Sequence, residues 1–196
     1  MISTKRKQNS MGDTPLAWAA ANGHEEVVKI LLERDDIEPD KPNRAGRTPL
    51  WSAASNGHEA VVKMLLRQND VNPDRTSWFG QTPLWSAVAN GHGGVVGALL
   101  ERDEVNPDKP NWYGQTPLWE AVCNGYEGIV KILLEREDVN PDNPDLDGRT
   151  PLRLAADNGH EGVVKMLLGR DDVNPDKPDH GSRPALRQLT QDKTNV

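Results

Sequence analysis

The chain has 196 residues and a formal net charge of −7, and an acidic chain without a basic stripe argues against binding to nucleic-acid backbones. Its single cysteine excludes an intrachain disulfide, and the sequence shows neither a signal peptide nor an apolar run of the roughly 18 residues that a membrane span needs. We therefore expect a cytoplasmic or otherwise intracellular protein, with nuclear import left open by Lys5-Arg6-Lys7, and no membrane or nucleic-acid partner.

A 34-residue period organises the chain, because the tripeptide Thr-Pro-Leu begins at residues 14, 48, 82, 116 and 150. A glycine always precedes it by two positions, and Asn-Gly, two β-branched residues and Leu-Leu follow at constant distances. Such a period is typical of proteins in which each repeat packs on its neighbours. We expect a polar tail (1–11), five repeats over 12–180 that start near 12, 46, 80, 114 and 148, and a degenerate sixth repeat or cap (181–196).

Within one repeat, taken as residues 46–80, the sequence predicts two helices and a loop. Thr48 suits the cap of the first helix, Pro49 suits its first turn, and Gly57 suits its end. The second helix is expected over residues 59–67, where valines and leucines recur at helical spacing. The remainder is rich in Asn, Asp, Pro and Gly, which predicts an extended, hairpin-like loop.

Gly-Arg-Thr-Pro-Leu-Trp-Ser-Ala-Ala-Ser-Asn-Gly-His at residues 46–58 resembles the ankyrin repeat, whose usual signature is Thr-Pro-Leu-His-x-Ala. The resemblance covers residues 12–176, although each unit is one residue longer than the common 33-residue form. It implies an all-α fold, an ankyrin-repeat solenoid of stacked helix–turn–helix units with hairpin-like loops. The Asp-Val-Asn-Pro-Asp loops, as at residues 172–176, resemble ankyrin arrays common in filamentous fungi, where they often form the recognition part of larger proteins.

The resemblance also implies a non-enzymatic protein–protein interaction module whose loop tips and first helices line a concave groove. Three consecutive repeats have tryptophan where the family usually has His, and two loop tips carry aromatic pairs. Exposed Trp and Tyr beside Arg is the composition of a binding hot spot. The candidate binding residues for a protein or peptide are Trp51, Trp78, Phe79, Trp85, Trp112, Tyr113, Trp119, Arg47, Arg149 and Arg153. A second interpretation of the three first-helix tryptophans, at 51, 85 and 119, is packing between repeats.

The alternative function is that of a small-molecule binder or an atypical enzyme. Glu120, Arg153 and Asp157 are expected to face one another, which would place an acid–base group beside an aromatic wall. Cys123 is the one thiol near them. The ligand would then be small and aromatic or anionic.

Two further patterns favour structural interpretations. The histidine after Asn-Gly recurs in four repeats, and we expect its ring to hydrogen-bond the backbone at the start of the second helix. Asp172, Asn174 and Asp176 imitate the start of a calcium loop, but Lys177 and Arg183 stand where its Gly and Glu are required. We expect no metal and no cofactor, and we expect a monomer.

Overall fold

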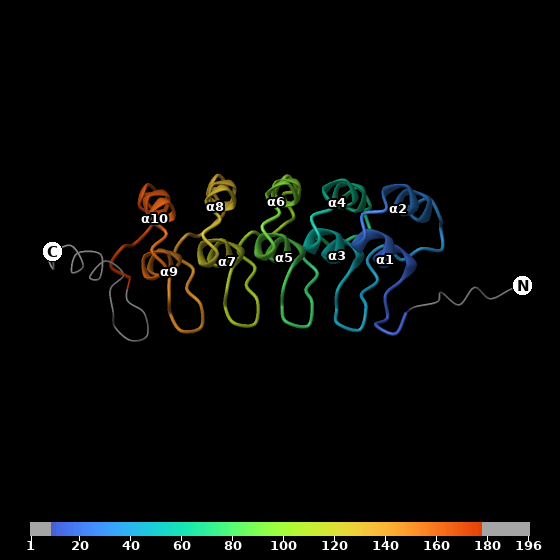
Figure 1. Ribbon diagram of the computed structural model, residues 1–196, viewed down its shortest axis with the longest axis horizontal. Coiled ribbons are helices and arrows are strands. Elements are labelled where there is room, and N and C mark those ends of the chain that lie inside the picture. The colour runs from blue at the N-terminus through green and yellow to red at the C-terminus, as the bar shows by residue number, and fades with distance from the viewer. Residues whose placement is uncertain (1–8, 178–196) are drawn as a thin grey trace, which may run out of the picture. The chain divides into compact units, whose positions relative to one another are not determined.

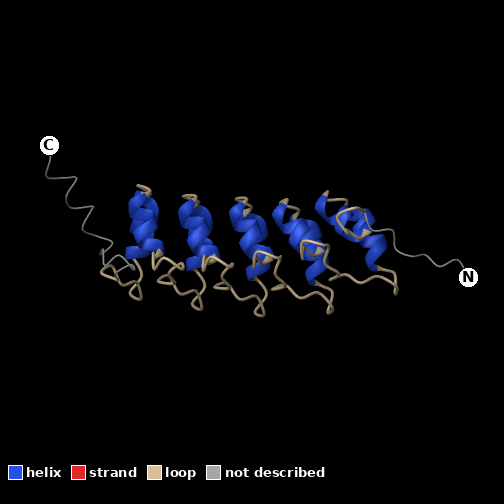
Figure 2. Cartoon of the chain, turned by 90° about the horizontal axis from the view of Figure 1, so that it is seen from below, coloured by secondary structure: helices blue, strands red, loops and turns tan. Residues whose placement is uncertain are grey.

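The computed structural model describes residues 9–177, and within that range the chain forms helices and loops but no strand (Figure 2). The all-α prediction is confirmed. Each 34-residue repeat contributes one short first helix and one second helix: α1 (Pro15–Ala21), α2 (Glu25–Leu32), α3 (Pro49–Ser55), α4 (Glu59–Leu66), α5 (Pro83–Ala89), α6 (Gly93–Leu100), α7 (Pro117–Cys123), α8 (Glu127–Leu134), α9 (Pro151–Asp157) and α10 (Glu161–Leu168). The predicted cap at 181–196 and most of the predicted tail lie outside the described residues.

The helices fall into two compact units, unit 1 up to Asn106 and unit 2 from Pro107 onward. In unit 1, α3 contacts both α1 and α5, and α4 contacts both α2 and α6. In unit 2, α7 contacts α9 and α8 contacts α10. Each unit is thus a stack of helical hairpins, with the first helices in one layer, the second helices in another, and loops extending from the first-helix layer (Figure 1). Within residues 9–177, none of the helices has the length and apolarity needed to cross a bilayer.

The first helices begin where the sequence predicts, because a threonine caps each of them. In the second repeat, Thr48 accepts a hydrogen bond from the backbone N–H of Trp51 at 3.0 Å, and Pro49 fills the first turn. Gly57, just after the helix, has a φ of +76°, which is the left-handed conformation that glycine accepts without strain. The second helix of this repeat ends at Leu66, one residue before the predicted end.

The core repeats with the sequence. The leucine of every Thr-Pro-Leu is almost completely buried, as are most of the alanines that follow it in the first helices, such as Ala53 and Ala54. These small side chains let neighbouring first helices approach closely, while the valines and leucines of the second helices fill the space between layers. Neither layer could bury its apolar side without the other.

The histidines connect successive repeats, and their partner differs from the one expected. Nε2 of His58 donates to the carbonyl oxygen of Ala21 at 3.0 Å, so the ring reaches the end of the preceding repeat's first helix, not the start of its own second helix. His92 and His160 make the same contact with Ser55 and Cys123, respectively. The geometry requires a glycine in the preceding repeat, because a Cβ added at Gly23 would lie 2.5 Å from Nδ1 of His58.

The loops are hairpin-like without being strands. In the loop before α3, the N–H of Asn43 donates to the carbonyl of Arg47 at 2.9 Å, which closes a tight tip. Neighbouring tips are also joined within each unit by backbone hydrogen bonds: the N–H of Trp78 donates to the carbonyl of Ala45 at 3.0 Å in unit 1, and the N–H of Leu146 donates to the carbonyl of Tyr113 at 3.2 Å in unit 2. These bonds fix the direction in which each tip presents its side chains.

Candidate functional site

The loop tips present aromatic side chains to solvent. In unit 1, Trp78 and Phe79 are 63% and 53% exposed, and in unit 2, Trp112 and Tyr113 are 67% and 61% exposed. Single exposed apolar residues are common on proteins, but adjacent exposed aromatic residues at a conformationally fixed tip are not. These four residues are therefore accessible to a partner in the described structure.

The first-helix tryptophans, although candidate binding residues from the sequence, are not accessible to a partner. Trp51, Trp85 and Trp119 are only 7%, 9% and 5% exposed. Their Nε1–H groups have no hydrogen-bond acceptor within residues 9–177. These tryptophans therefore stabilise the fold through burial of the large apolar ring and not through a hydrogen bond. The packing interpretation describes these three side chains.

The three candidate arginines have different surroundings. Arg47 lies over the ring of Trp51, with its guanidinium carbon 4.4 Å from the ring centroid, in the geometry of a cation–π contact. Arg153 is buried at the position that holds tryptophan in the second, third and fourth repeats, and it pairs with Asp157 of the same helix at 2.8 Å. Both charges of that pair are therefore engaged.

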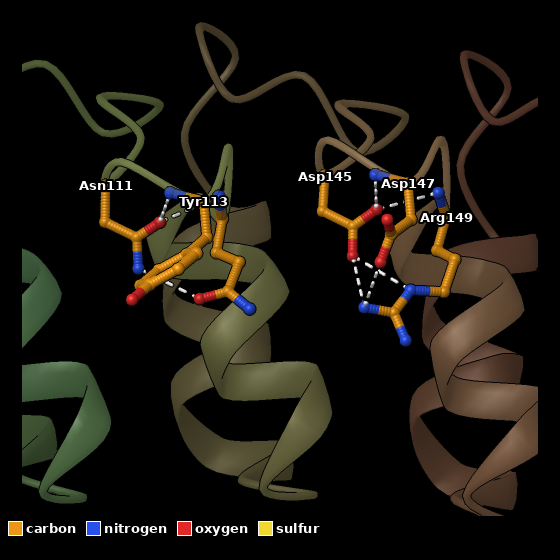
Figure 3. A network of polar contacts seen from close by, with 6 residues as sticks. Asn111, Tyr113, Asp145, Asp147 and Arg149 are labelled. Carbon is orange, nitrogen blue, oxygen red and sulfur yellow. Dashed lines mark hydrogen bonds and ion pairs between the residues drawn. The ribbon is translucent and has the colours of Figure 1, made fainter. Parts of the chain in front are cut away.

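Arg149, in unit 2, makes ion pairs, as Arg153 does, and also lies near a tryptophan ring, as Arg47 does (Figure 3). Its guanidinium pairs with the buried carboxylate of Asp145 at 2.7 Å and with Asp147 at 3.2 Å. It also lies 5.8 Å from the ring centroid of Trp119. Figure 3 shows both carboxylates facing the same edge of the guanidinium, so that its charge is compensated within the tip.

The residues of the enzymatic alternative lie in unit 2. Glu120 accepts a hydrogen bond from Nδ2 of Asn124 at 3.0 Å, and burial raises the pKa of its carboxyl group. Burial and the nearby charge of Glu120 raise the pKa of the Cys123 thiol, although Arg149 opposes the shift. A raised pKa keeps the thiol protonated at neutral pH, which is the opposite of what a nucleophilic cysteine needs. In the described part of the chain, no three His, Cys, Asp or Glu side chains are grouped so as to hold a metal ion.

Unit 1 contains a concave pocket of about 360 Å³ between α1 and α3. Its wall includes Arg47 and Trp51, which were candidates from the sequence, and Met11, Asp13 and Trp18, which were not. Trp18 is 55% exposed and stands where the second repeat has Ser52. That difference between repeats was the available signal, but the sequence alone did not show that Trp18 would border a pocket.

The comparisons with known proteins agree with the fold. The family model described as ankyrin repeats (3 copies) matches the chain at residues 2–77, 68–143 and 105–179, which together span most of its length. The search of curated proteins found no match. Ankyrin repeats are in general protein–protein interaction modules. On the combined evidence of repeat period, helix pairs and family match, this chain belongs to the ankyrin repeat family.

Proposed function

We propose that this chain is a non-enzymatic interaction module that binds a protein or peptide through the aromatic residues of its loop tips. One observation carries the proposal: the tip residues Trp78, Phe79, Trp112 and Tyr113 are all more than half exposed, whereas the first-helix tryptophans are buried. Large exposed aromatic side chains cost solvation free energy in the free protein and are the residues that most often anchor a partner.

The backbone of these tips supports the proposal, because an ordered anchor loses little entropy on binding. In unit 1, the N–H of Trp78 donates to Ala45 and the N–H of Phe79 donates to the Ser77 hydroxyl. In unit 2, the N–H of Tyr113 donates to Oδ1 of Asn111 at 2.9 Å. Each unit thus offers a preorganised aromatic pair of its own.

The test is the double variant Trp78→Ala and Trp112→Ala. Proteins captured by the wild-type chain from its native cell extract are identified by mass spectrometry, and each purified partner is titrated against wild type and variant. We expect the affinity to fall by about 30-fold or more, since one aromatic anchor contributes about 2 kcal/mol. The free energy of unfolding should be unchanged, because both side chains are exposed.

Leu146→Ala is the matched control. Leu146 occupies the equivalent tip position one repeat after Trp112 and is equally exposed, but it is aliphatic. We expect that variant to retain the affinity of the wild type. Equal partner affinity of the double tryptophan variant and the wild-type chain would remove the proposal.

A further inference from the structure

The loop tips follow a pairing rule. The side chain at the first tip position and the side chain four residues later form a hydrogen bond or ion pair in four of the tips: Asn9 with Asp13 (2.8 Å), Ser77 with Gln81 (3.4 Å), Asn111 with Gln115 (2.9 Å) and Asp145 with Arg149 (2.7 Å). In each case one side chain donates and the other accepts. The pairing therefore depends on complementary residue types at the two positions.

The tip at residues 43–47 breaks this rule because Asn43 has no acceptor left for Arg47. Its Oδ1 accepts the N–H groups of Ala45 and Arg47, and its Nδ2 donates to Asp13 of the preceding repeat at 2.7 Å. The Arg47 guanidinium makes no ion pair within residues 9–177 and lies over Trp51. Unit 1 thus contains a half-buried cation that lies on an aromatic ring and makes no ion pair with the described residues.

The cation borders the pocket between α1 and α3, whose volume of about 360 Å³ suits a small group and not a whole protein surface. Next to Arg47 the wall offers apolar area, because Met11 and Trp18 are each more than half exposed. Asp13 is the opposing charge in the wall, but both of its carboxylate oxygens already accept hydrogen bonds, from Nδ2 of Asn9 and Nδ2 of Asn43. The pocket therefore combines one cation that makes no ion pair within residues 9–177, one carboxylate whose oxygens are already hydrogen-bonded, and aromatic and aliphatic surface.

We infer that this pocket binds a carboxylate attached to an apolar group. The carboxylate takes the place at Arg47 that Asp145 takes at Arg149, and the apolar group packs on Trp18 and Met11. The inference goes beyond the proposed function, because the pocket residues are not the exposed tip aromatic pairs. A peptide C-terminus with an apolar last residue and a free aromatic acid share this chemistry.

Three probes test the ligand class by isothermal titration: an acetylated tetrapeptide ending in leucine with a free carboxylate, its C-terminal amide, and phenylacetate. We expect at least one carboxylate to bind and the amide to bind about 10-fold more weakly or worse, since hydrogen bonds to charged groups are the strong ones. Binding of the peptide acid alone identifies a C-terminus as the source, and tighter binding of phenylacetate identifies a small acid. The inference is overturned if both acids fail to bind below about 10 mM or if the amide binds as tightly as the acid.

Arg47→Gln tests the position. Glutamine is the residue of the third and fourth repeats at this site, so the tip should fold. We expect the affinity for the acid probe to fall by about 10-fold or more, and the Trp51 indole N–H resonance to stop shifting on titration. Arg44→Gln removes the same charge from the same tip outside the pocket and should leave the affinity unchanged. Equal losses in the two variants would mean that only net charge matters and would overturn the inference.

A second variant supplies Arg47 with a carboxylate from the protein itself. Asn43→Asp combined with Asp13→Asn keeps the net charge and reverses the donor and acceptor of the bond between these two side chains. It also gives Arg47 an internal carboxylate, as Asp145 does for Arg149. We expect this variant to fold and to bind the acid probe about 10-fold more weakly or worse, although Arg47 is retained. Undiminished binding would contradict the role of the uncompensated guanidinium.

Discussion

Partly buried aspartates join successive loops within each unit. Oδ2 of Asp74 accepts the backbone N–H of Asn106 at 3.0 Å, and Oδ2 of Asp108 accepts that of Asn140 at 2.8 Å. Burial raises the pKa of Asp108, against the opposing effect of its hydrogen bonds from Asn140 and Asn143. The ionised carboxylate is therefore costly in the folded state.

The sign of the resulting pH dependence follows from linkage. Because the folded pKa of Asp108 is above the unfolded value near 3.8, the carboxyl group lowers the free energy of unfolding at neutral pH. This loss of folding stability disappears as the pH falls through the pKa of the folded state toward the pKa of the unfolded state.

Asp108→Asn isolates this effect, because the amide keeps an acceptor oxygen for Asn140 and loses the charge. We expect the variant to be at least as stable as the wild type at about pH 7, and its advantage to shrink as pH falls toward about 4. Urea unfolding at both pH values measures the difference. Asp108→Ala, which removes the acceptor, should be less stable than Asp108→Asn by about 1 kcal/mol. A constant difference across the pH range would show that the buried charge costs nothing.

Among the helices, α6 has an unusual sequence, with glycines at positions 93, 94 and 97. Gly97 lies in the helix interior, and apart from its chain neighbours and the backbone of its own helix, a Cβ added there would meet no atom within 4 Å. A Cβ at Gly94, in contrast, would meet the Glu59 carboxylate of the neighbouring second helix. Gly97 therefore has no packing role that explains it, while it carries the conformational entropy cost of glycine in a helix.

Gly97→Ala should raise the free energy of unfolding by about 1 kcal/mol, through higher helix propensity and a less flexible unfolded chain. Gly57→Ala is the opposite case, because Gly57 has a φ of +76° and its added Cβ would lie 2.7 Å from Nδ1 of His92. That variant should lose stability. Chemical denaturation of both variants measures the changes, and a destabilised Gly97→Ala would refute the account of α6.

The helix starts could be predicted from the sequence because their signals are local. Thr48 and Pro49 mark the start of α3, and Gly57 marks its end, without reference to any other repeat. The end of α4 was placed one residue late because Arg67, which follows its last helical residue, has ordinary helical angles and no distinctive side chain. Local chemistry thus specified the elements wherever a residue with a special conformational role occurs.

At the scale of the whole molecule, exposure was less predictable, because it depends on what neighbouring repeats cover. The sequence made both Trp51 and Trp78 candidate binding residues and kept packing between repeats as a second interpretation for Trp51. The first is buried and the second is exposed. The uncompensated charge of Arg47 depends on Asn43 and on Asp13 of the preceding repeat together. The candidate site was chosen by comparing one repeat position at a time. Such a comparison cannot show an effect that depends on three residues from two repeats together.

Coupling between repeats is the remaining property of the molecule as a whole, since in a repeat stack the stability is a sum of intrinsic and interface contributions. In unit 1, His58 links the first two repeats through its bond to Ala21 and its close packing on Gly23. His24 is the same residue in the first repeat, where its exposed ring lies 5.3 Å from that of Trp18 and makes no such bond within residues 9–177.

His58→Ala should therefore lower the free energy of unfolding of unit 1 by about 1–2 kcal/mol, from the lost hydrogen bond and the lost ring packing. His24→Ala should cost only a few tenths of a kcal/mol, since an exposed side chain away from an interface contributes little. Hydrogen exchange locates the effect. In His58→Ala, the amides of α1 and α2 should exchange faster, because the first repeat is held to the stack partly by this contact. The amides of α9 and α10 in unit 2 should keep their wild-type exchange rates. Equal destabilisation by the two substitutions would mean that the histidine acts within its own repeat, and the description of His58 as a link between repeats would then be wrong.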